Sequence, residues 1–145
     1  MFKKILVPTD GSPLALSAAS TAIDLAKAHG AQIIGVYVID PFPYIGIGDA
    51  SAAGLQAYLS ESRSVAGQAL DALAKVCGAA GVPFSGDTIE RNVVYEGVIE
   101  TAQAEGCDLI VMASHGRQGV SALVLGSVAQ KVLTHTRLPV LIVKG

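Results

Sequence analysis

The chain alternates between segments of strand length and segments with helical spacing, and this alternation constrains its fold more than any other feature. The strand-like segments lie at 4–8, 32–39, 84–90, 108–113 and 139–143. Apolar residues recur at three- and four-residue spacing in the segments between them, at 13–29, 51–80, 93–105 and 127–135. Such alternation with short connections is typical of a parallel sheet with helices on both faces. We therefore predict a single α/β domain over residues 1–145, with a doubly wound, five-stranded parallel sheet.

Local signals mark the limits of several elements. Ser12-Pro13 provides an N-cap followed by proline at the first helical position, and Gly30 is typical of a helix end. The segment 84–90 alternates less cleanly than the other strands, which predicts a more exposed strand. Prolines and glycines make the segment 40–50 irregular. Its apolar residues are interpreted as a cover for the next helix, with a lid over a ligand as the alternative.

Composition and charge argue against several classes of protein. The formal net charge is −2, Trp is absent and no stripe of Lys and Arg exists, so a role in binding nucleic acid has little support. No apolar run approaches the ~18 residues of a membrane span, and the N-terminus lacks the pattern of a signal peptide. These features predict a cytoplasmic protein. Cys77 and Cys107 form no CxxC pair and are interpreted as reduced, half-buried thiols.

Two polar turns follow the first and the fourth predicted strands. The first is Thr9-Asp10-Gly11-Ser12, and the second is Ala113-Ser114-His115-Gly116, followed by Gly126-Ser127 at the start of a helix. Glycines let backbone N–H groups approach phosphate oxygens, and a helix N-terminus adds unpaired donors and partial positive charge. Ligands of such sheets bind beyond the carboxyl ends of strands, where the strand order switches. The two turns therefore predict a phosphate or nucleotide site.

The segments 4–12, 108–112 and 139–143 resemble the universal stress protein family, which has an adenine-nucleotide α-hydrolase-like fold. Nucleotide-binding members of that family carry Gly, two residues, Gly, nine residues, and Gly followed by Ser or Thr. Gly116 and Gly126-Ser127 match the last two parts with the right spacing, and Ala113 replaces the first glycine. If this position needs positive φ, the methyl group costs on the order of 1 kcal/mol. If it needs only a small residue, the methyl group is accommodated.

The resemblance implies an ATP or AMP site, with Mg²⁺ or Mn²⁺ accompanying the nucleotide. The residues it assigns are Pro8, Thr9 and Asp10 along the adenosine, Val38 at the adenine through its backbone, Met112 and Ala113 beside base and ribose, and Gly116, Gly126, Ser127 and Val128 as phosphate donors. Asp10 would bond the ribose or reach the divalent ion. Arg117 either screens phosphate charge or is a surface cation.

Each of these side chains also has a simpler interpretation. Ser127-x-x-Gln130 is a capping box that would satisfy the start of a helix without any ligand. Asp10 fits an Asp-Gly-Ser turn, although its place after the first strand favours a functional role. His115 is interpreted as solvated or in contact with phosphate, with a catalytic role as the less favoured alternative.

These observations favour a regulatory protein that binds ATP or AMP and signals through conformation or partner affinity. One alternative is a dimeric interaction protein of the same family that binds no nucleotide, and another is a slow or self-phosphorylating ATPase. P-loop and GxGxxG motifs are absent, so we expect at most very slow ATP hydrolysis. The apolar segment Val140–Val143 predicts a homodimer if it forms an edge strand, a partner that the resemblance also implies.

Overall fold

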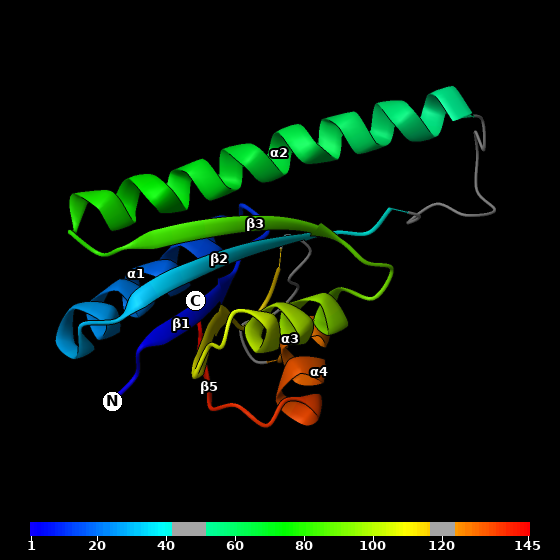
Figure 1. Ribbon diagram of the computed structural model, residues 1–145. Coiled ribbons are helices and arrows are strands. Elements are labelled where there is room, and N and C mark those ends of the chain that lie inside the picture. The colour runs from blue at the N-terminus through cyan, green and yellow to red at the C-terminus, as the bar shows by residue number, and fades with distance from the viewer. Residues whose placement is uncertain (42–51, 117–123) are drawn as a thin grey trace.

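The computed structural model describes residues 1–41, 52–116 and 124–145 (Figure 1). Strands and helices alternate along it as β1 (Lys4–Pro8), α1 (Pro13–His29), β2 (Gln32–Ile39), α2 (Ala52–Ala79), β3 (Phe84–Glu90), α3 (Val94–Ala104), β4 (Leu109–Ala113), α4 (Ser127–His135) and β5 (Val140–Val143). Each boundary predicted from the sequence lies within one residue of the observed one. Most of the segment 40–50 lies outside the described residues.

The ends of α1 show why its boundaries are predictable. The Ser12 hydroxyl accepts a hydrogen bond from the Ala15 N–H at 3.2 Å, and Pro13 occupies the first helical position. At the other end, Gly30 has a φ of 67°, the left-handed conformation that glycine adopts without steric cost, and its N–H bonds to the Ala26 carbonyl. The start of α1 is thus fixed beside the carboxyl end of β1.

The strands pair in the order β3-β2-β1-β4-β5, and every pairing is parallel. The chain builds outward from β1 through β2 to β3 and then returns to the other side of β1 to add β4 and β5. This confirms the prediction of a doubly wound, five-stranded parallel sheet. The direction of growth reverses between β1 and β4, so a crevice at their carboxyl ends is expected.

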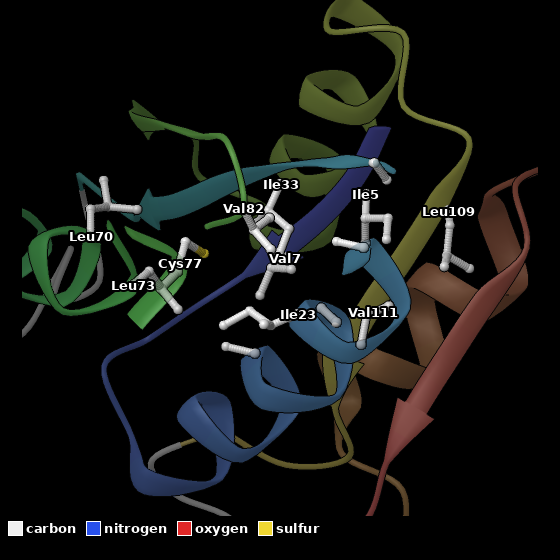
Figure 2. Close-up of a cluster of buried hydrophobic side chains, with 14 residues drawn as sticks. Ile5, Val7, Ile23, Ile33, Leu70, Leu73, Cys77, Val82, Leu109 and Val111 are labelled. Carbon is white, nitrogen blue, oxygen red and sulfur yellow. The ribbon is translucent and has the colours of Figure 1, made fainter. Parts of the chain in front are cut away.

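Two apolar clusters cover the two faces of the sheet. Ile5 and Val7 of β1 point toward α1 and α2, where they pack near Ile23 and Leu73 (Figure 2). Leu6, between them in sequence, joins the opposite cluster, which also includes residues of α3 and α4. All three β1 residues are fully buried, as expected for the central strand of a sheet covered on both faces.

The edge strands of the sheet are β3 and β5. Residues 85–88 of β3 are exposed, which confirms the prediction that this strand is the more exposed one. β5 pairs with β4 on one side and is an edge strand, which is the condition under which the sequence predicts a homodimer through this segment. β5 is apolar throughout, and the side chain of Leu141 is 37% exposed.

Both cysteines are free thiols, as predicted, but they are buried rather than half-buried. Cys77 packs in the cluster beneath α2, and Cys107 in the cluster beneath α3. Burial raises the pKa of the Cys107 thiol to about 11, with a smaller contribution from the Glu105 carboxylate. Of the helices in the described ranges, none combines the length and the apolar character needed to cross a membrane.

Candidate functional site

A cavity of about 880 Å³ lies at the carboxyl ends of β1, β2 and β4, beside the first turns of α3 and α4. Its size is within the ~300–1,000 Å³ typical of small-molecule sites. Ten residues that the sequence assigned to a site line it, namely Pro8, Thr9, Asp10, Val38, Met112, Ala113, Gly116, Gly126, Ser127 and Val128. Arg117 lies outside the described residues. Parallel strands bring these distant segments together because all their carboxyl ends meet at one edge of the sheet.

The turn after β1 has the local bonds expected of an Asp-Gly-Ser turn. Asp10 Oδ1 accepts the Ser12 N–H at 2.9 Å, and Thr9 Oγ1 accepts the Gly11 N–H at 3.1 Å. The other carboxylate oxygen of Asp10 lies against Gly116, where a Cβ would come within 2.8 Å of Oδ2. The two predicted polar turns therefore pack on each other. The φ of Gly116 is not in the left-handed region, so the close approach of the Asp10 carboxylate, rather than the backbone conformation, favours glycine at this position.

The replacement of the first motif glycine leaves the backbone unstrained. Ala113 is the last residue of β4 and pairs with Val143 of β5. No non-glycine residue in the described ranges has a positive φ, so Ala113 has an ordinary conformation for an L-residue. The sequence left open whether this position needs a positive φ or only a small residue. A need for positive φ does not apply to this chain.

The start of α4 differs from the prediction at two residues. Gly126 is the N-cap, since its carbonyl accepts the Gln130 N–H at 2.9 Å, so Ser127 is the first helical residue and the predicted capping box does not form. The Gly126 N–H already donates to the Ser114 carbonyl at 2.7 Å, so it cannot serve as the expected phosphate donor. The N–H groups of Ser127 and Val128 lie in the first turn, where an α-helix provides no acceptor.

Val38 presents a backbone donor and acceptor to the cavity. In a parallel strand the N–H and C=O of one residue point to the same side, and the next residue points to the other side. The Val36 carbonyl accepts the Thr9 N–H on the β1 side, whereas the Ile39 carbonyl accepts the Arg91 N–H on the β3 side. Val38 therefore faces the β1 side, but β1 pairing ends at Val36. Its N–H and C=O are left beside the cavity that it lines.

Sequence reasoning missed part of the cavity wall. Asp40 follows β2 directly, and Val94 and Val98 belong to the first turns of α3. The signals were available, because Asp40 is a polar residue after a strand and the two valines have the i, i+4 spacing of one helix face. Asp40 is also linked to α2, since its carbonyl accepts a hydrogen bond from the Tyr58 hydroxyl at 2.7 Å.

The charges around the cavity come from carboxylates. Asp10 and Asp40 line it, whereas no Lys or Arg does so among the described residues. Within the same ranges, no group of three or more His, Cys, Asp or Glu side chains is placed to hold a metal ion. The geometry thus combines an apolar wall, a backbone donor–acceptor pair at Val38, a helix N-terminus and the carboxylate of Asp10.

Comparison with known proteins agrees with this architecture. A model described as the universal stress protein family matches residues 1–144. The universal stress protein MJ0531 of Methanocaldococcus jannaschii is 37% identical over 99% of this chain and 83% of its own length. A universal stress protein of Thermus aquaticus is 35% identical over 99% of this chain and its full length.

Solved structures share the fold. The protein MJ0577 of Methanocaldococcus jannaschii superimposes with a TM-score of 0.86 at 26% identity, over 100% of this chain and 97% of that one. A universal stress protein in complex with cAMP (TM-score 0.74, 24% identity) and one from Arabidopsis thaliana with AMP bound (0.70, 14%) share the fold at lower identity. The family match over almost the whole chain, together with these relatives, shows that the chain belongs to the universal stress protein family.

Proposed function

We propose that the cavity binds ATP or AMP and that the protein is a stress-response regulator whose conformation or partner affinity follows its nucleotide state. The observation that carries this proposal is the pairing of two complementary ends in one cavity. At one end, the C=O and N–H of Val38 match the amino group and N1 of adenine. At the other end, the N–H groups of Ser127 and Val128 match phosphate oxygens.

We assign Asp10 to the ribose or to a divalent ion. Its Oδ1 is used by the turn, while Oδ2 lies beside Gly116 on the phosphate side of the cavity. Because Asp10 and Asp40 both contribute negative charge, a polyphosphate would bring Mg²⁺ or Mn²⁺ as its counter-ion. We therefore expect divalent metal to strengthen the binding of ATP more than that of AMP. The cAMP and AMP complexes of proteins with the same fold support an adenine nucleotide as the ligand class.

The first test is the nucleotide content of the protein as purified. Mass spectrometry after denaturation should detect adenine nucleotide, and calorimetric titration with ATP and Mg²⁺ should show saturable heat. Gly126→Val should abolish this heat because its side chain meets the Ser114 carbonyl. Gly67→Ala is the control for a glycine substitution as such, since a Cβ there meets no atom of the described residues within 4 Å. A folded parent protein with neither heat nor thermal shift at millimolar ATP would contradict the proposal and favour an interaction protein that binds no nucleotide.

A homodimer through β5 is the second proposal. β5 is an edge strand of four apolar residues, and an unpaired strand edge of this kind favours pairing with a second copy. Light scattering after gel filtration should give about twice the chain mass of 14.8 kDa. Leu141→Lys should lower that mass, whereas Val76→Lys, at an exposed valine of α2, should not. A parent protein that is monomeric at high micromolar concentration would overturn this proposal.

A further inference from the structure

The carboxyl end of β2 extends beyond one of its two neighbouring strands. β1 pairs with β2 only as far as Val36, whereas β3 pairs with it as far as Ile39. β3 is itself an edge strand, and its residues 85–88 are exposed. The segment that carries Val38, and with it the proposed contact to the nucleobase, is therefore held within the sheet from one side alone.

A tyrosine of α2 holds this end of β2 from outside the sheet. The Tyr58 hydroxyl donates a partly buried hydrogen bond of 2.7 Å to the Asp40 carbonyl, two residues after Val38. Between them, Ile39 is held from the β3 side, because its carbonyl accepts the Arg91 N–H at 2.9 Å. Of Tyr58 and Asp40, only Asp40 lines the cavity. Tyr58 would thus act on a ligand through β2 and not by contact.

The part of α2 that carries Tyr58 lies outside the core. At 28 residues α2 is about 42 Å long, whereas the seven residues of β3 span about 23 Å. The first turns of the helix project beyond the sheet, and its buried side chains begin only at Ala66 (Figure 1). Arg63 also pairs with Glu90 of β3 at 2.9 Å, but both side chains are exposed, and such pairs contribute little. The partly buried hydrogen bond of Tyr58 is the firmer of these two links.

We propose that Tyr58 is a positioning residue for the nucleobase. By holding the Asp40 carbonyl, it fixes the direction in which Val38 presents its N–H and C=O to the cavity. This inference rests on the proposed function, because it concerns the base contact of the same cavity. Hydrogen bonds weaken steeply as their angle departs from linear, so a small swing of the strand end would weaken both contacts to the base.

The test compares adenosine with purine riboside, which lacks the 6-amino group that the Val38 carbonyl would accept. In the parent, calorimetric titration should show that adenosine binds roughly tenfold more tightly than purine riboside. Tyr58→Phe removes the hydroxyl and keeps the ring, and it should reduce this preference to about threefold or less, with a matching loss of adenosine affinity. If the hydroxyl served only the fold, both ligands would lose affinity equally and the preference would stay unchanged.

Tyr95→Phe is the matched control, since it makes the same chemical change in α3, where the ring of Tyr95 packs beside that of His135. Its preference for adenosine should remain within about twofold of that of the parent. Amide hydrogen exchange without ligand is the second measurement. The Arg91 N–H, which donates to the Ile39 carbonyl, should exchange at least about threefold faster in Tyr58→Phe than in the parent. Thermal unfolding should show that both variants are folded, because each keeps its ring.

The outcomes distinguish this inference from the proposed function. A parent protein that binds no adenine compound would overturn the proposed function and this role of Tyr58 with it. A parent that prefers adenosine, with a folded Tyr58→Phe that keeps the full preference over purine riboside, would overturn the role of Tyr58 alone. An unchanged exchange rate of the Arg91 amide would also overturn it, because the hydroxyl would then not hold the end of β2.

Discussion

Replacing Gly126 by alanine is expected to damage both the fold and the proposed nucleotide site, because a Cβ has no room there. The added atom would lie 2.6 Å from the Ser114 carbonyl oxygen and 3.2 Å from the His115 Cα. Both obstacles are backbone atoms, so neither can rotate away. The φ of Gly126 is −64°, which alanine adopts readily, so the whole effect is steric.

The size of the effect follows from what must move. The start of α4 has to retreat from β4, and overpacking of this kind costs about 1–3 kcal/mol. The same movement stretches the 2.7 Å hydrogen bond from the Gly126 N–H to Ser114, whose loss adds about 1 kcal/mol. We expect Gly126→Ala to lower the free energy of unfolding by about 2–4 kcal/mol. Because the first turn of α4 moves with it, nucleotide affinity should fall as well.

Urea unfolding followed by circular dichroism measures the first effect, and calorimetric titration with ATP and Mg²⁺ measures the second. Gly67→Ala makes the same chemical change within α2, where space is open, and should stabilise by about 0.5–1 kcal/mol. Among the described residues, Gly116→Ala meets only the Asp10 carboxylate, a side chain that can rotate, so it should cost less stability than Gly126→Ala. The steric reasoning fails if Gly126→Ala is as stable as the parent and binds ATP equally well.

Two further predictions concern thiol ionisation and hydrolysis. Burial raises the pKa of Cys107 from 9.0 to about 11, so the folded state holds the thiol proton more tightly than the unfolded state. This contribution to the free energy of unfolding is complete below about pH 9 and is lost toward pH 11, by on the order of 2 kcal/mol. Urea unfolding should show that the free energy of unfolding falls less steeply over this pH range in Cys107→Ala than in the parent. ATP turnover should stay well below about 1 s⁻¹, since among the described lining residues no Lys or Arg meets the charge that develops on the phosphate. Faster release of phosphate, lost in Asp10→Ala, would contradict this expectation.

The elements were predictable because their signals are local. Ser12-Pro13 and Gly30 determine the ends of α1 through atoms only a few residues apart. The placement of the two polar turns at one edge was also predictable, because it follows from parallel strands of any order. The sequence therefore predicted, without any knowledge of contacts, that the two turns meet at one edge of the sheet, where the cavity lies.

The details that the sequence did not predict depend on contacts between distant segments. Ser127 and Gly126 are adjacent, and Gly126 caps α4 while its N–H bonds to the Ser114 carbonyl in the turn after β4. The same bond removes a phosphate donor that the motif spacing suggested. Asp40 and Val94 carry local signals, but only the packing of β2 and α3 shows that both residues reach the cavity.

Ala113 provides the last prediction, since it tests whether the missing motif glycine limits binding. The residue lies in regular strand geometry with an ordinary φ, so Ala113→Gly relieves no backbone strain. The greater freedom of glycine in a strand should instead lower the free energy of unfolding by about 0.5–1 kcal/mol. ATP affinity should remain within about twofold of the parent, because the N–H groups of α4 and the backbone of Val38 are unchanged. If Ala113→Gly raised affinity tenfold or more in calorimetry, the methyl group would be an obstacle in the cavity, and this chain would be a family member adapted away from tight nucleotide binding.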